Sequence, residues 1–130
     1  MSTFALLEVP QVKGQIRLQK LAINGVCEFD EFCSRIESEG NLRAQLRGIF
    51  AVMEDVAHQR RLPKGKFRDI TPKGERNKEY EIKKGALRVY LTKDENGHIV
   101  VIGGKKNAQP RDLGRFRVIK KRYFDSKQRS

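Results

Sequence analysis

Residues 79–106 read EYEIKKGALRVYLTKDENGHIVVIGGKK, and this stretch decides the predicted fold. Apolar, β-branched and aromatic residues recur there in three short runs separated by turn signals, the clearer of which is Asp94–Gly97. The runs predict strands over 79–83, 87–92 and 98–102. Because residues 99–102 are uninterruptedly apolar, we expect the last of these strands to be central and buried on both faces. The stretch therefore predicts the centre of a small antiparallel sheet.

Helices are predicted on both sides of this stretch. Apolar residues recur at helical spacing over 28–38 and over 42–59. A strand is expected over 16–23, where apolar and polar residues alternate before an Asn-Gly turn. Pro110 begins a last helix with one apolar and one basic face. The predicted order is β-α-α-β-β-β-α, an α+β domain with an N-terminal helical hairpin and a C-terminal helix on a small antiparallel sheet.

The chain length predicts a single domain. Its 130 residues match the usual size of one domain, so we expect residues 1–130 to form one unit. Residues 1–15 are interpreted as an arm or an extra strand, and residues 66–70 are compatible with a further short strand. Two cysteines, Cys27 and Cys33, lack the spacing of a zinc or redox pair. No metal and no cofactor are expected.

The charge of the chain points to a polyanionic partner. Lysine and arginine number 28 against 16 acidic residues, giving a net charge of +12. The charge is uneven, since residues 1–59 are slightly acidic and residues 60–130 are strongly basic. Such a balance fits nucleic acid, an acidic membrane surface or an acidic protein. No apolar run is long enough to cross a membrane, and the start does not resemble a signal peptide. Cys27 and Cys33 are expected to be reduced, which suits a cytoplasm, and no membrane partner is expected.

The motifs Tyr80–Lys83, Leu87–Tyr90 and Ile99–Lys106, followed by the C-terminal helix, resemble the RelE/ParE/HigB toxin superfamily of bacterial type II toxin–antitoxin systems. The resemblance covers about residues 16–124 and implies a RelE-like fold. RelE- and HigB-type members cleave messenger RNA on the ribosome and so inhibit translation, whereas ParE-type members inhibit DNA gyrase. It therefore implies messenger RNA, the ribosome and a cognate antitoxin as partners in a bacterial cytoplasm.

Carried over by position, the basic cleft of the family corresponds to Lys83, Arg88 and either Lys105 or Lys106. Two positions depart from the family pattern. Glu81 stands where RelE-type enzymes often have a second lysine, and Asp112 lies near the position of an expected tyrosine. The first departure changes the charge pattern, and the second removes a group suited to stacking or to proton donation.

Metal-independent RNA cleavage requires a base, a charge stabiliser for the phosphorane and a proton donor for the leaving oxygen. Arg88 is the predicted stabiliser, because a guanidinium pairs two phosphate oxygens and stays charged. Lys83 is the candidate base among crowded cations, with Lys106 as a further catalytic candidate. Glu81 is either an alternative base or an ion-pair partner. Further candidates for RNA contact are Lys84, Lys105, Arg111, Arg115, Tyr80 and Tyr90.

Less specific interpretations remain open for each of these residues. Lysines and arginines on small sheets often only solvate an open face, and the two tyrosines could pack against the core instead of stacking on bases. The basic last helix could follow RNA phosphates or provide a docking face for an antitoxin. The function classes retained are a messenger RNA endoribonuclease, a ParE-like gyrase inhibitor without nuclease activity, and a degenerate module that only binds RNA or antitoxin.

Overall fold

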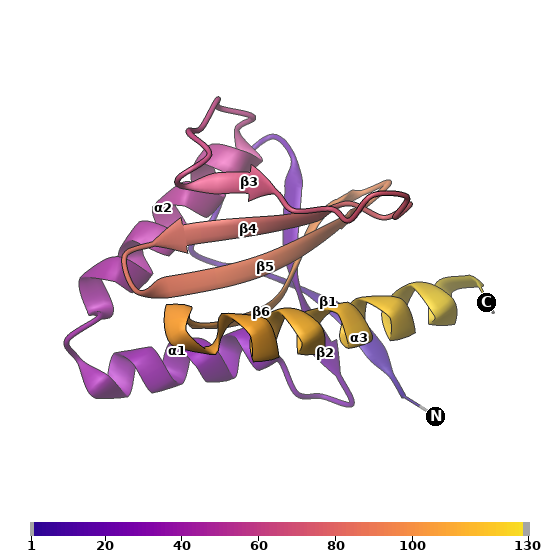
Figure 1. Cartoon of the computed structure of the whole chain (residues 1–130), viewed down its shortest axis with the longest axis horizontal. Coiled ribbons are helices and arrows are strands. Elements are labelled where there is room, and N and C mark those ends of the chain that lie inside the picture. The colour runs from indigo at the N-terminus through magenta and orange to yellow at the C-terminus, as the bar shows by residue number, and fades with distance from the viewer. Residues whose placement is uncertain (1, 129–130) are drawn as a thin grey trace.

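The computed structural model describes residues 2–128, so residue 1 and residues 129–130 of the predicted domain lie outside the described part (Figure 1). The α+β class and the C-terminal helix are confirmed. The elements are β1 (Phe4–Glu8), β2 (Arg17–Ile23), α1 (Glu28–Glu39), α2 (Arg43–Ala57), β3 (Phe67–Asp69), β4 (Glu79–Lys84), β5 (Leu87–Asp94), β6 (Gly97–Lys105), the 3-10 turn η1 (Lys106–Ala108) and α3 (Gln109–Gln128).

The predicted element order omits two strands that the structure contains. β1 lies in the stretch read as an arm or an extra strand, and β3 lies within residues 66–70. Both are short strands at the edges of the sheet, and each pairs with a single neighbouring strand. Their few residues give too weak an alternating pattern to predict a strand with certainty of its bounds. The two predicted helices agree with α1 and α2 to within two residues at each end.

The six described strands form one sheet in the order β1-β2-β6-β5-β4-β3. Four pairings are antiparallel, but β2 and β6 are parallel. The prediction of a wholly antiparallel sheet is therefore wrong at this pair. The chain leaves β2 through two helices and returns through the β4–β5–β6 meander, which brings β6 beside β2 in the same direction. The apolar run of β6 is buried, as predicted, because helices cover both faces of the sheet there.

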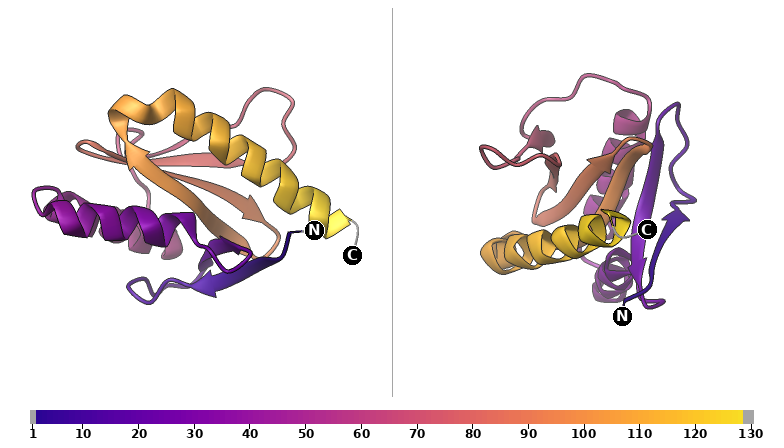
Figure 2. Two further views of the ribbon diagram at one scale, coloured as in Figure 1. Left: turned by 90° about the horizontal axis from the view of Figure 1, so that it is seen from below. Right: turned by 90° about the vertical axis from the view of Figure 1, so that its right-hand side faces the viewer.

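The helices α1 and α2 cover one face of the sheet and α3 covers the other (Figure 2). Successive side chains of β5 point to these two faces in turn. Leu87, Val89 and Leu91 pack into the core beneath α1 and α2, which we call the hairpin face. Tyr90 packs into a second core with Phe116 of α3, and we call this side the α3 face. Residues that pair directly across neighbouring strands share a face, so the register of β4 and β5 assigns each predicted site residue to one side.

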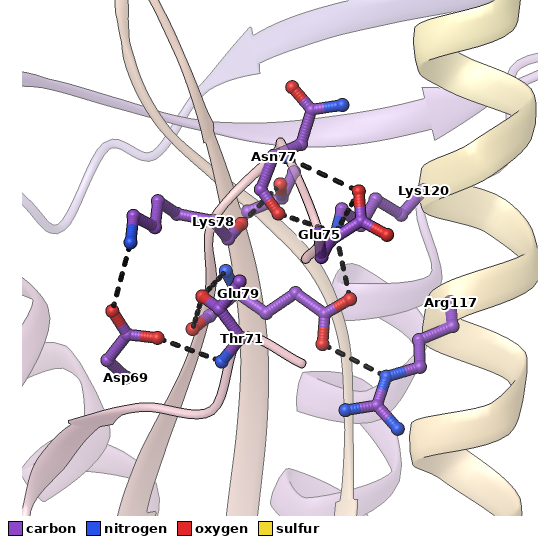
Figure 3. A network of polar contacts seen from close by, with 9 residues as sticks. Asp69, Thr71, Glu75, Asn77, Lys78, Glu79, Arg117 and Lys120 are labelled. Atoms are coloured by element: carbon purple, nitrogen blue, oxygen red, sulfur yellow. Dashed lines mark hydrogen bonds and ion pairs between the residues drawn. The ribbon is translucent and has the colours of Figure 1, made fainter. Parts of the chain in front are cut away.

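A buried ion cluster fastens α3 to the sheet (Figure 3). Glu79 at the start of β4 is 1% exposed and accepts hydrogen bonds from Arg117 Nε at 3.0 Å and Lys120 Nζ at 2.8 Å. Lys120, itself 4% exposed, also donates to the Asn77 carbonyl at 2.6 Å. Two cations of the basic helix thus neutralise a buried carboxylate, Lys120 from within the core and Arg117 from a partly exposed position. Among residues 2–128, no helix is long and apolar enough to cross a membrane.

Candidate nucleic-acid interface

The turn between β4 and β5 is held from three directions. The Ala86 N–H donates to Gln45 Oε1 of α2 at 2.7 Å, and the Ala86 carbonyl accepts from the Lys106 N–H at 2.8 Å. The Gly85 carbonyl accepts from Arg88 Nη1 at 2.8 Å. Gly85 has a φ of +55°, a conformation that a glycine adopts without strain. The residues before and after this turn are consequently fixed relative to α2, β6 and η1.

Arg88 places a buried guanidinium beside this turn. The residue is 6% exposed, and its Nη1 donates to the carbonyls of Gly85 and Leu87, each at 2.8 Å. Its Nε is buried and has no hydrogen-bond partner among the described residues. Nor does any described carboxylate lie within ion-pair distance of it. A buried cation without an anion is costly, so this site favours an incoming anion such as a phosphate.

Lys83 lies directly opposite Arg88 in the β4–β5 register, and the two share the α3 face. Gly104 of β6 is the neighbour of Arg88 on the other side. Lys106 follows two residues later and joins the turn through its backbone N–H. Lys83 and Lys106 are exposed and form no ion pair with the described carboxylates. The structure therefore brings these three predicted catalytic residues around one turn, with Lys83 and Arg88 on one face.

Glu81 is held as an ion-pair and hydrogen-bond partner. It is 4% exposed, its Oε2 accepts from Gln109 Nε2 at 2.6 Å, and its Oε1 lies 3.4 Å from Arg68 Nε. Both carboxylate oxygens are engaged, which favours the partner interpretation over the alternative base. Sequence reasoning missed Gln109 and Arg68. The pairing of Arg68 with Glu81 would follow from the register of the short strand at 66–70.

Three predicted RNA-contact cations already have acidic partners. Lys105 Nζ lies 2.8 Å from Glu39, Arg111 Nε lies 3.6 Å from Asp112, and Arg115 pairs with Glu28. These pairs reduce the local positive potential at the end of β6 and along α3. Asp112, near the position of the missing tyrosine, is buried and packs over Gly104, where a Cβ would collide with its carboxylate.

The two predicted stacking residues lie on opposite faces of the sheet. Tyr90 is fully buried on the α3 face, and burial raises the pKa of its hydroxyl to about 12. Tyr80 belongs to the hairpin face, where its ring stacks on Phe67 at a centroid distance of 5.1 Å and contacts His98 at 5.3 Å. Tyr90 therefore packs in the core in this structure. The half-buried Tyr80 ring lies on the face of the sheet opposite Arg88.

His98 and Cys33 are titratable groups that lie outside the turn between β4 and β5. Burial, with a smaller contribution from Lys93, lowers the pKa of His98 to about 4, so its imidazole is neutral at physiological pH. Burial also raises the pKa of the Cys33 thiol to about 12. Within the described part of the chain, no group of three His, Cys, Asp or Glu residues could hold a metal ion.

We define the cationic turn as Lys83, Lys84, Arg88 and Lys106. It is a positively charged, restrained hairpin turn, and no described carboxylate forms an ion pair with these four residues. Comparison with protein-family models, with curated proteins and with solved structures finds no match to this chain. The functional argument therefore depends on the geometry of this turn.

Proposed function

We propose that this protein binds single-stranded RNA at the cationic turn and cleaves messenger RNA without a metal, as the toxin of a type II toxin–antitoxin system with a RelE-like fold. The observation that carries the proposal is Arg88, a buried guanidinium that lacks an acidic partner and has an unpartnered Nε. A phosphate diester bound at the guanidinium would supply the missing negative charge.

Arg88 binds the non-bridging oxygens of the scissile phosphate and stabilises the charge that develops on the phosphorane. Lys83, opposite Arg88 on the same face, is assigned to the 2′-hydroxyl as its proton acceptor. Lys106, on the other side of the turn, is assigned to the leaving 5′-oxygen as its proton donor. The deprotonated 2′-oxygen attacks the adjacent phosphorus, and the P–O5′ bond breaks. The products are a 2′,3′-cyclic phosphate and a 5′-hydroxyl. Glu81 holds Gln109 and Arg68 and takes no proton.

The test is cleavage of a translated message, mapped by primer extension. Wild-type protein is expected to produce new 5′ ends, and Arg88→Ala should reduce their rate of formation by about 10²–10³-fold, the usual effect of removing one oxyanion donor. Lys83→Gln is the second variant, because Lys83 is exposed and its replacement spares the fold. Lys93→Gln, at the far end of β5, is the matched charge control. No cleavage by wild-type protein, with or without ribosomes, overturns the nuclease proposal.

The departures at Glu81 and Asp112 support a second candidate, a ParE-like inhibitor of DNA gyrase without nuclease activity. Glu81 has both oxygens engaged, and Asp112 is buried, so neither supplies the group expected of a RelE-type enzyme. Gyrase-dependent DNA breaks with intact message would favour this candidate. Tight RNA binding without cleavage and without growth arrest would instead favour the degenerate binding module. In all three cases the proposed setting is the cytoplasm, with an antitoxin as partner.

A further inference from the structure

Lys83 and Lys84 leave β4 on opposite faces of the sheet. Lys83 pairs with Arg88 on the α3 face, whereas Lys84 pairs with Leu87, which packs into the core beneath α1 and α2. Both side chains are exposed, and no described carboxylate forms an ion pair with either. The turn thus presents one unneutralised ammonium group toward each side of the sheet.

A glycine in the middle of α2 makes room for Lys84. A Cβ on Gly48 would lie 2.6 Å from Lys84 Cε and 2.9 Å from Lys84 Cγ, so the aliphatic part of the lysine lies across the helix at this residue. Glycine is unfavourable inside a helix, where alanine is preferred. The cradle confines the lysine stem, so less side-chain entropy is lost when its ammonium group binds an anion.

Arg47, the residue before Gly48, is a second cation of α2. It is exposed and, like Lys84, forms no ion pair with the described carboxylates. The contact of Gln45 with Ala86 keeps this part of α2 against the turn. The spacing between the cations of α2 and those of the α3 face is therefore set by the fold.

We infer that Lys84 and Arg47 form a second phosphate-binding subsite on the α2 side of the turn. A single RNA strand held at Arg88 on the α3 face passes around the Gly85–Ala86 turn and places a neighbouring backbone phosphate against Lys84 and Arg47. The inference rests on the proposed function, since it assigns the second contact of the same ligand. The subsite contacts the RNA backbone only, so its affinity does not depend on the base sequence.

The experiment measures the affinity of a fluorescently labelled 2′-O-methyl RNA oligomer by anisotropy over a range of salt concentrations. This probe lacks the attacking 2′-hydroxyl and so stays intact. For single strands, the slope of log K against log salt changes by about 0.7 for each phosphate contact. The double variant Arg47→Gln/Lys84→Gln should therefore bind with a slope smaller by about 1.4.

The matched control is Lys13→Gln/Lys93→Gln, which removes the same charge from two exposed cations away from the turn. This control should keep a slope close to that of the wild-type protein. Equal slopes for the two double variants, with binding still weakened by Lys83→Gln, would overturn the second subsite and leave the proposed function standing. Wild-type protein that does not bind the oligomer at low salt would overturn the proposed function, and this inference with it.

Discussion

Replacing Glu79 by glutamine tests whether the buried ion cluster holds α3 on the sheet. The substitution keeps the shape of the side chain but removes the carboxylate charge that faces Arg117 at 3.0 Å and Lys120 at 2.8 Å. Lys120 would then be a buried ammonium group whose remaining anionic partner is the half-exposed Glu75, 3.5 Å away, beside the neutral oxygens of the Asn77 carbonyl and of the new amide. Breaking a buried pair in this way costs about 3–5 kcal/mol, and the remaining contact with Glu75 places the expected loss at about 3 kcal/mol.

Urea unfolding followed by circular dichroism measures this loss as a lower midpoint with an unchanged slope. Glu8→Gln is the matched control, because Glu8 is exposed at the end of β1 and its replacement should change the free energy of unfolding by less than about 0.5 kcal/mol. Adding Lys120→Met to Glu79→Gln removes the uncompensated charge and should restore part of the stability. A loss below about 1 kcal/mol, or a double variant no more stable than the single one, would refute the reasoning.

Three further predictions follow from other residues. The free energy of unfolding should fall as the pH drops from about 6.5 toward 4, by about 3 kcal/mol in total, because the unfolded chain protonates His98 before the folded chain does; His98→Gln should flatten this dependence in urea titrations. Gly48→Ala should raise the free energy of unfolding by up to about 1 kcal/mol, because alanine is favoured inside a helix, yet it should weaken RNA binding because Lys84 is displaced. A thermal melt measures the first effect, and an anisotropy titration measures the second. The thiol of Cys33 should react slowly with a disulfide reagent at pH 8 until urea is added, because its thiolate is scarce in the folded chain; rapid labelling of the native protein would contradict this.

The strands and helices with a strong local pattern were predictable from sequence. The apolar runs of β4 and β5 predicted two strands joined by a turn, and the register of the structure then places Lys83 opposite Arg88. The parallel pairing of β2 with β6 was not predictable, because those strands meet only after two helices and three further strands have folded between them. Pairings of that kind depend on how distant segments dock, and no local signal specifies them.

The polar interior was hidden from sequence reasoning for a related reason. Glu79 and Lys120 are charged residues of types that are seldom fully buried, so a surface position is the default interpretation for each. They are 41 residues apart and find each other only when α3 packs across β4. The same holds for Gln109 and Glu81, whose contact reassigns Glu81 from a candidate base to an anchor of the last helix.

The central claim is that the Arg88 guanidinium, whose Nε has no hydrogen-bond partner among the described residues, receives a phosphate of RNA. The most direct measurement is the ¹H–¹⁵N resonance of this Nε–H group, assigned with Arg88→Lys, during a titration with 2′-O-methyl RNA. The account predicts that the resonance moves and saturates at the dissociation constant found by anisotropy, while the Arg117 Nε–H, already bonded to Glu79, stays in place. An Arg88 resonance that does not move at saturating RNA, while backbone signals elsewhere do, would contradict it.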